Sequence, residues 1–291
     1  MDEEPNRGRL VFVTARPGGG KNATGDLLRD KNWLHFDGDL FVFGCPDPTQ
    51  FSSSGGSRPN LEQMRGWREA RSPEIRQVAD AWAAVQHNTM STGEAEPASV
   101  DGTTMSVQEF AVAWPVPPTG AVAIPGGARA AAAAFFAALA AAVQKKRAEC
   151  PNRDLVVSHA LFKNAHRQAV LDAFPHESEL IYLNVPTSLL GERLWARFKA
   201  SGYSDEEILR GDPSAAEALG VPLEDITKEI LQAHYVGRST RGWEELEGSR
   251  LRSQVKVVEV TEGMGPEEVM TLVLRTGYVA RSNTPGRDFG K

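Results

Sequence analysis

The sequence predicts an α/β fold with a doubly wound, parallel, five-stranded sheet, and three observations lead to it. Five short apolar runs lack the alternation of half-exposed strands, which is typical of strands buried on both faces. Stretches with helical patterns separate these runs, and this alternation favours a parallel sheet with helices on both faces. A glycine-rich turn joins the first apolar run to the first helical stretch. At 291 residues the chain is long enough for such a domain.

The expected strands and helices alternate along the chain. The strands are predicted at Leu10–Thr14, Trp33–Phe36, Leu155–Ser158, Leu180–Asn184 and Val255–Val260. The helices that separate or follow them are predicted at Ala23–Arg29, Lys163–Ala173, Ser188–Phe198 and Pro266–Arg275. Proline is well tolerated at a helix start because the first N–H groups have no partner within the helix.

A long insertion, about residues 40–150, separates the second and third strands. A helix is predicted from about Asn60 to Gln86, and a segment rich in Pro, Gly, Ser and Thr follows it. Ala128–Arg147 is predicted to be helical from its alanine content and from the basic residues of its last turn. The whole chain, residues 1–291, is expected to form a single domain that carries this insertion.

Composition and charge exclude several classes of protein. The net charge is −6 with both signs well mixed, which argues against a nucleic-acid partner. Cys45 and Cys150 lie far apart without metal-ligand spacing, so a reducing compartment is the simpler interpretation. Because no segment reaches the roughly 20 apolar residues of a membrane span, and the N-terminus is acidic and polar, we expect a cytoplasmic protein without a membrane partner. The oligomeric state stays open, and a homodimer is one arrangement that the sequence allows.

The glycine-rich turn has most of the features of a phosphate-binding loop. It runs from Ala15 to Asn22 and approximates the pattern G-x-x-x-x-G-K-[ST], with Ala15 at the first glycine and Asn22 at the hydroxyl position. Its glycines can turn backbone N–H groups toward phosphate oxygens, and the following helix presents its positive end. The residues expected to bind nucleotide phosphates are Gly18, Gly19, Gly20, Lys21, Asn22 and Ala23. An ordinary strand-to-helix turn is the alternative interpretation.

A second signal is Asp37-Gly38-Asp39, which follows the second predicted strand. In a doubly wound sheet this strand end lies beside the phosphate loop. Two carboxylates there can divide the work, since one can hold Mg²⁺ and the other can orient or deprotonate a hydroxyl. Alone, the tripeptide is more often a turn, and its position in the chain favours the functional interpretation.

These motifs, in this order, resemble the gluconate kinase and shikimate kinase group of P-loop small-molecule kinases. The segment from Leu155 to Lys163 with His166-Arg167 is similar to a gluconate kinase segment, and the helix Leu190–Arg197 resembles the one that leads into that family's lid. The resemblance implies a nucleoside-monophosphate-kinase-like fold, ATP and Mg²⁺ as cofactors, and a lid at about residues 198–240.

The resemblance also implies roles for individual residues. Lys21, Asp37, Asp39 and Arg197 would be catalytic, with Asp39 near the acceptor and Arg193 near the phosphates. Asn22 and Asp37 would hold the metal, although an amide oxygen is a weaker ligand than the usual hydroxyl. Because the insertion is longer than the acceptor-binding region of that family, gluconate is not transferred as substrate.

Other basic residues are candidates for binding the acceptor. Lys163, His166 and Arg167 share one helical face, which is either an anion-binding surface or a solvated one. His159 follows a central strand and is either a site residue or a buried structural histidine. Arg65 and Arg68 could line a site for an anionic acceptor, or could form a solvated helix surface with neighbouring glutamates.

The function expected from the sequence is ATP-dependent phosphorylation of a hydroxyl on a small polar metabolite such as a sugar acid, sugar or polyol. A nucleoside monophosphate kinase is an alternative, since Trp67 and Trp82 could contact a base. A non-catalytic nucleotide-binding protein is another, supported by Ala15 and Asn22.

Overall fold

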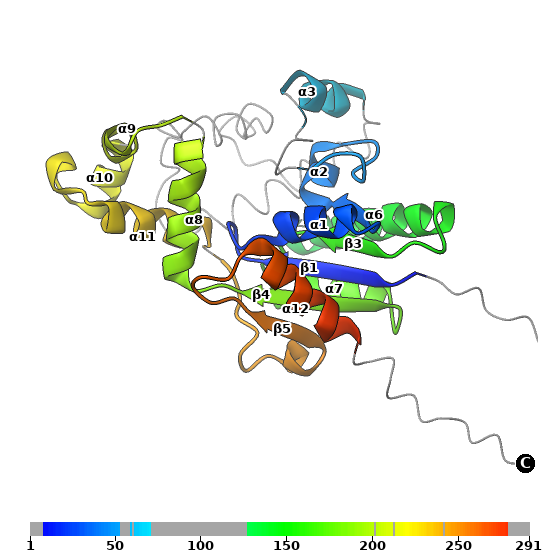
Figure 1. Ribbon diagram of the computed structural model, residues 1–291. Coiled ribbons are helices and arrows are strands. Elements are labelled where there is room, and N and C mark those ends of the chain that lie inside the picture. Colours follow the sequence, from blue (N-terminus) through cyan, green and yellow to red (C-terminus); the bar gives the residue numbers. More distant parts are fainter. Residues whose placement is uncertain are drawn as a thin grey trace, which may run out of the picture.

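A five-stranded, all-parallel sheet forms the centre of the molecule (Figure 1). The computed structural model describes residues 8–52, 59, 61–70, 127–200, 202–211, 213–240 and 242–278. The strands lie in the order β2-β3-β1-β4-β5 and every neighbouring pair is parallel, which confirms the predicted doubly wound sheet. The strands are β1 (Leu10–Ala15), β2 (Leu34–Asp37), β3 (Leu155–Ser158), β4 (Ser178–Asn184) and β5 (Val255–Glu259).

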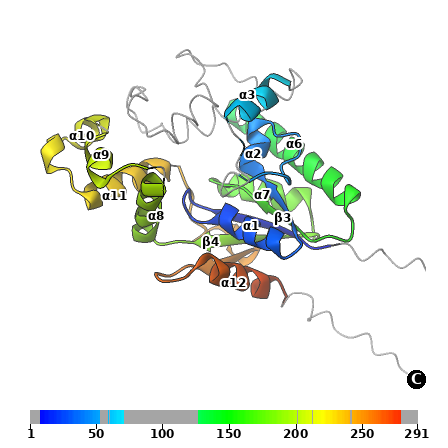
Figure 2. The ribbon, with the colours of Figure 1, turned by 45° about the horizontal axis from the view of Figure 1, so that its top comes forward.

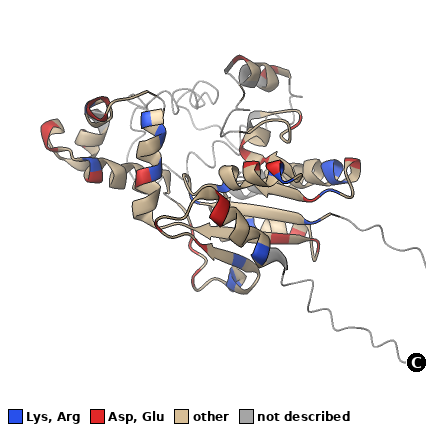
Figure 3. Cartoon of the chain, viewed as in Figure 1, with Lys and Arg blue, Asp and Glu red and all other residues tan. Residues whose placement is uncertain are grey.

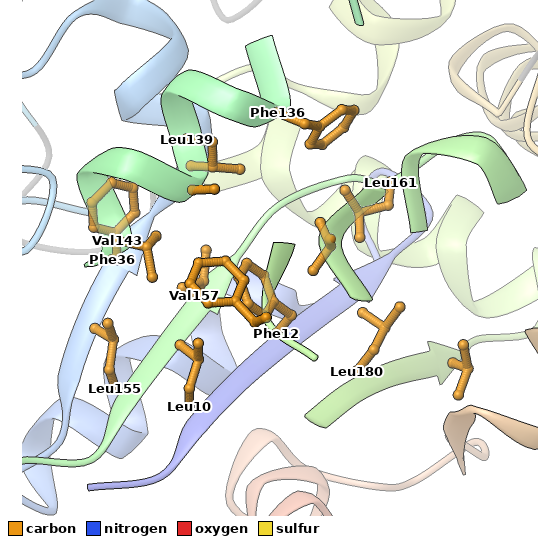
Figure 4. Packing of buried hydrophobic residues seen from close by; sticks show 14 of the residues in the cluster. Leu10, Phe12, Phe36, Phe136, Leu139, Val143, Leu155, Val157, Leu161 and Leu180 are labelled. Carbon is orange, nitrogen blue, oxygen red and sulfur yellow. The ribbon is translucent and has the colours of Figure 1, made fainter. Parts of the chain in front are cut away.

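Both faces of the sheet are buried beneath helices (Figure 2). Successive side chains of a strand point to opposite faces, so Leu10 and Phe12 join one hydrophobic cluster while Val11 and Val13 join the other. Figure 4 shows the first cluster, in which β-strand side chains meet those of α6. The covering helices are α6 (Gly127–Glu149) and α7 (Asn164–Ala173) on that face, and α1 (Lys21–Asp30) and α12 (Pro266–Tyr278) on the other.

The alanine-rich helix α6 is amphipathic despite its low complexity. Phe135, Leu139 and Val143 recur at helical spacing and are almost completely buried against the sheet. Ala133 and Ala137 are exposed. The observed helix contains the predicted one and extends it at both ends.

A group of helices between β4 and β5 projects from the sheet, at the left of Figure 1. It has a hydrophobic core of its own, formed by residues such as Trp195, Phe198, Ile208 and Leu231. A capping box between Ser204 and Glu207 begins the second of its helices. The helices are α8 (Thr187–Ala200), α9 (Asp205–Arg210), α10 (Pro213–Leu219) and α11 (Lys228–Ser239), with a 3-10 turn, η1, at Leu223–Asp225. A second 3-10 turn, η2 (Arg250–Ser253), precedes β5.

Two helices belong to the start of the predicted insertion. The sequence did not predict α2 (Gly38–Phe43), which begins directly after β2. Helix α3 (Leu61–Ala70) matches the beginning of the helix predicted from Asn60, and residues 71–126 lie outside the described part of the chain. A Phe51–Trp67 ring contact, with centroids 4.9 Å apart, packs α3 near α2.

The described residues show the mixture of charges that the composition indicates (Figure 3). Acidic and basic positions are interspersed along the helices in Figure 3. Within the described ranges, no helix combines the length and apolar character needed to cross a membrane.

Candidate functional site

The phosphate loop connects the end of β1 to the start of α1. Gly18 and Gly20 have φ values of 80° and 90°, in the left-handed region that favours glycine. Ala15 stands where the pattern has its first glycine, but it is the last residue of β1 and completely buried. Because the strand backbone there is extended, alanine fits this position. The departure at Ala15 therefore leaves the loop geometry intact.

The positive end of α1 is open toward this loop. The helix begins at Lys21, and the residue before it, Gly20, provides no side-chain cap. Its first turn contains no acidic residue. The first N–H groups of a helix have no partners within it, so they are available to an anion. The local backbone and Lys21 together can bind phosphate oxygens.

Asp39 lies at the centre of the site, with each carboxylate oxygen bound by a different side chain. Lys21 Nζ lies 2.8 Å from Oδ2, and His159 Nδ1 lies 3.1 Å from Oδ1. Burial alone would raise the pKa of Asp39, but the charge of Lys21 and the hydrogen bond from His159 outweigh it and hold the pKa well below its usual range. Asp39 is therefore an ionised hydrogen-bond acceptor beside the phosphate loop.

Asp37 has a structural role that the sequence did not reveal. Its Oδ1 accepts hydrogen bonds from the backbone N–H groups of Asp39 and Leu40, at 2.9 and 3.3 Å, and so caps α2. Its Oδ2 accepts a hydrogen bond from Asn22 Nδ2 at 3.1 Å. The capped helix start thus brings Asp37 to Asn22 of the phosphate loop, and the functional interpretation of this segment stays a prediction.

The donor chemistry of Asn22 and Asp37 fits Mg²⁺. Mg²⁺ prefers oxygen ligands, keeps several waters, and is usually held by one or two protein groups together with phosphates. Asp37 supplies a carboxylate and Asn22 an amide oxygen on adjacent side chains. In the part of the chain that the structure describes, no group of three or more His, Cys, Asp or Glu residues could hold a metal by itself. A metal here would accordingly depend on the phosphates of a nucleotide.

Two arginines of α8 lie at different distances from the loop. Arg193 donates from NH1 to the carbonyl of Gly19 at 3.2 Å, and burial lowers the pKa of its guanidinium. Arg197 lies one turn farther along α8 and is exposed. Of the two candidates, Arg193 is the one that contacts the phosphate loop. The catalytic role expected for Arg197 stays a prediction.

The candidates after β3 do not form a solvated basic face. His159 and His166 are 2% and 7% exposed, and Arg167 is completely buried. Burial and the nearby positive charges lower the pKa of His166 to about 3, so its ring is neutral at neutral pH. Lys163 precedes α7 and pairs with Glu244 at 3.4 Å. The solvated alternative therefore does not hold for His166 and Arg167, and the anion-binding alternative stays a prediction.

Arg167 binds protein groups through NH1, and its expected role in binding an acceptor stays a prediction. Its NH1 donates to Asn164 Oδ1 at 2.7 Å and to the carbonyl of Glu244 at 2.6 Å. The guanidinium also lies over the ring of Trp243, 4.6 Å from the centroid. Burial lowers the pKa of Arg167 to about 10, which leaves it charged at neutral pH. It fixes the segment after α11 to α7.

Two of the residues expected to bind an acceptor belong to α3. Arg65 and Arg68 belong to α3, whose backbone is described, but their side chains lie outside the described residues. Their role in binding an acceptor stays a prediction.

A buried polar network next to the site has no counterpart among the sequence candidates. His35 Nε2 lies 2.8 Å from Ser158 Oγ, and its Nδ1 lies 2.9 Å from Asp26 Oδ1. Ser52 donates to the other oxygen of Asp26 at 2.7 Å. This network joins α1, β2, β3 and the start of the insertion. Most residues of this network are distant from one another in the sequence, so no local sequence pattern predicts their contacts.

Comparisons with known proteins give a likeness at the level of the fold. No protein-family model and no curated protein match the chain. A gluconokinase from Sinorhizobium meliloti 1021 has 15% sequence identity and a TM-score of 0.40, over 96% of this chain and 97% of that one. Shikimate kinase from Acinetobacter baumannii, in complex with shikimate, has 10% identity and a TM-score of 0.38, over 97% of each chain. The Deinococcus radiodurans tunicamycin resistance protein has 11% identity and a TM-score of 0.38, over 93% of this chain and 96% of that one. Both groups named from the sequence motifs, gluconate and shikimate kinases, are thus among the similar solved structures.

Proposed function

We propose that this protein is an ATP- and Mg²⁺-dependent kinase that phosphorylates a hydroxyl group of a small polar metabolite. The observation that carries the proposal is the 2.8 Å contact between Lys21 and Asp39. The contact joins Lys21, at the open N-terminal end of α1, to the ionised carboxylate of Asp39, which follows β2. Transfer from a phosphoryl donor to a hydroxyl acceptor needs both groups within hydrogen-bond distance of the reacting atoms.

The nucleotide phosphates would bind at the open end of α1. The backbone N–H groups from Gly20 to Ala23 offer donors, and Lys21 offers a charge for the outer phosphates. Arg193, which already contacts the loop at Gly19, would neutralise charge on the transferring group. Arg197 would join it when the α8–α11 unit closes over the site.

The acceptor hydroxyl would be oriented by Asp39. Its lowered pKa makes it a weak base, but phosphoryl transfer passes through a loose transition state in which positioning counts for more than early deprotonation. The acceptor oxygen forms a bond to the γ-phosphorus while the bond between that phosphorus and the β–γ bridging oxygen breaks. ADP leaves, and the hydroxyl proton passes to Asp39 and then to solvent.

Asp37 and Asn22 are the residues that would hold Mg²⁺ with the nucleotide. When bound, the ion would supply charge neutralisation at the β- and γ-phosphates. Asp37 keeps its capping bonds to α2 through Oδ1, which leaves Oδ2 directed toward Asn22 and the phosphate loop.

A screen of ATP consumption tests the proposal. Purified protein is assayed with Mg²⁺ against sugar acids, sugars, polyols, shikimate and nucleoside monophosphates. We expect turnover with a small polyhydroxylated acceptor, and a loss of about 100-fold or more in Lys21→Met. Lys31→Met is the matched control, because Lys31 is exposed at the other end of α1. Near wild-type turnover in Lys21→Met would refute the mechanism.

The contact between Asn22 and Asp37 favours one competing function, a non-catalytic nucleotide-binding protein. The Asn22 amide is hydrogen-bonded to the Asp37 carboxylate oxygen that a metal would use. Calorimetry with ATP separates the two functions. Tight binding that is independent of Mg²⁺, with no turnover for any acceptor, would favour the non-catalytic protein, whereas turnover with a nucleoside monophosphate alone would change the acceptor class.

A further inference from the structure

Two residues bind Asp39, and a bound nucleotide would affect these two contacts differently. Lys21 Nζ binds Oδ2 at 2.8 Å and His159 Nδ1 binds Oδ1 at 3.1 Å. Lys21 begins α1 beside the phosphate loop, so phosphate oxygens would compete with Asp39 for its charge. His159 directly follows β3 and binds the other carboxylate oxygen of Asp39.

The position of His159 is fixed by its surroundings. The side chain is 2% exposed, and its ring lies 5.5 Å from that of Phe135 on α6. Its backbone N–H donates to the carbonyl of Val13 at 3.2 Å. A Cβ at Gly38 would lie only 2.8 Å from His159 Cβ, so the glycine between the two aspartates is what lets this histidine approach. The ring contact with Phe135 and the close approach that Gly38 allows therefore hold the imidazole at Asp39.

The direction of the His159–Asp39 hydrogen bond follows from its partners. An ionised carboxylate can only accept, so Nδ1 must carry the hydrogen. The ion pair with Lys21 Nζ, 2.8 Å from Oδ2, identifies Asp39 as a carboxylate. Since Nδ1 is engaged with Asp39 and the ring is buried, the geometry supports a role that acts through Asp39, while the acceptor-binding role expected from the sequence stays a prediction.

We propose that His159 is a positioning residue, which keeps Asp39 directed at the acceptor after a nucleotide has drawn Lys21 away. This inference rests on the proposed kinase function. Without nucleotide, Lys21 occupies Oδ2 and blocks the place of the acceptor hydroxyl. With nucleotide, Oδ2 is released while Oδ1 stays bound to His159. The acceptor site is therefore completed only when nucleotide is present, and acceptor affinity rises with nucleotide occupancy.

Substitutions at His159 test this role kinetically. His159→Leu removes the hydrogen bond to Asp39, whereas His159→Asn keeps a donor at the same number of bonds from Cα. We expect His159→Leu to raise the KM for the acceptor and lower kcat, with kcat/KM reduced about tenfold or more. His159→Asn restores most of this loss, and the Kd for ATP changes less than about twofold in both variants. His176→Asn is the matched control, since His176 is exposed and precedes β4 at the opposite edge of the sheet. A kcat/KM in His159→Leu equal to that of the wild type would overturn the proposal.

A spectroscopic measurement decides the same question even if no acceptor is ever turned over. Nitrogen NMR of ¹⁵N-labelled protein reports the protonated Nδ1 of His159, identified by its absence in His159→Asn and its shift in Asp39→Ala. The proposal expects this signal to persist when a non-hydrolysable ATP analogue and Mg²⁺ are added. Loss of the Nδ1 hydrogen bond on nucleotide binding would overturn it. Failure of the acceptor screen with a persistent signal would instead count against the kinase function alone.

Discussion

Asn22 is the residue that sets the cost of metal binding in this site. Its Nδ2 donates to Asp37 Oδ2 at 3.1 Å, in a helix position where the pattern has serine or threonine. To offer its oxygen to a metal, the amide must turn and give up this hydrogen bond. A hydroxyl can donate to the carboxylate and ligate a metal at once. In the proposed function, Mg²⁺ binding here would therefore cost about 1 kcal/mol, the net value of one hydrogen bond.

This cost predicts that Asn22→Ser lowers the Mg²⁺ concentration for half-maximal activity by about fivefold. The measurement is a Mg²⁺ titration of ATP turnover at saturating nucleotide. Thr24→Ser serves as the control, because the Thr24 hydroxyl binds the carbonyl of Gly20 on the same helix. An unchanged or raised Mg²⁺ requirement in Asn22→Ser would place the metal away from residue 22.

Among the elements, the start and end of the long insertion are tied together by one ion pair. Lys146, near the end of α6, lies 2.8 Å from Asp47, which follows α2. Burial alone would raise the pKa of Asp47, but hydrogen bonds from Lys146, Thr49 and Gln50 lower it to about 2. The pair is partly exposed, with 28% of the Asp47 side chain accessible, so its contribution is screened by solvent. It nevertheless connects segments 99 residues apart.

The pair predicts a pH-dependent loss of stability in Lys146→Met. Because the folded-state pKa of Asp47 is depressed, its stabilisation is present above the unfolded value of about 3.8 and is lost as pH falls toward about 2. We expect Lys146→Met to lower the free energy of unfolding by about 0.5–1 kcal/mol at pH 7, and by less at pH 3. Chemical denaturation at both pH values measures this. Lys145→Met is the control at the exposed neighbouring position, and an equal loss in both variants would contradict the role of the pair.

Some helices and strands could be predicted from the sequence, and others could not. The strands and the first helix could be predicted because apolar runs and a glycine-rich turn are local signals, and the sheet then brings Asp39 beside Lys21. Helix α2 could not, because Asp37 caps it only once β2 has ended in the required orientation. The surroundings of Arg167 could not either. Its spacing indicates a helix face, but the group that covers that face, Glu244, is 77 residues away.

At the scale of the whole molecule, the structure consists of a sheet-centred body and a helical unit with its own core. The body holds the phosphate loop, Asp37 and Asp39, while α8 to α11 form the separate cluster around Trp195 and Leu231. The chain enters this unit through α8, whose first part packs on the sheet through Leu190. It returns through the segment after α11, where Glu244 is bound to α7. Closure of this unit over a nucleotide would bend these two connections.

The return connection is fixed mainly by Arg167. Its guanidinium holds the carbonyl of Glu244 and lies over Trp243, and the carboxylate of Glu244 accepts from the backbone N–H of Asn164 at 2.8 Å. Burying an arginine costs free energy, as its lowered pKa indicates, and two short charged hydrogen bonds and the ring contact offset part of that cost. Removing the side chain leaves a buried carbonyl without its donor. Lysine cannot replace it, since a point charge neither stacks nor forms the same fork of bonds.

We therefore expect Arg167→Met to lower the free energy of unfolding by about 3 kcal/mol, and Arg167→Lys to recover little of it. Limited proteolysis should cut first near Trp243, because the segment after α11 loses its attachment to α7. Gln168→Met, at the next residue, removes an exposed hydrogen bond to Asp172 on the same helix and should behave as the wild type. ATP affinity should change little in any of the three variants, since the phosphate loop lies on other elements. Wild-type stability in Arg167→Met would show that the return connection is held by its apolar contacts instead, and closure would then have to bend at α8 alone.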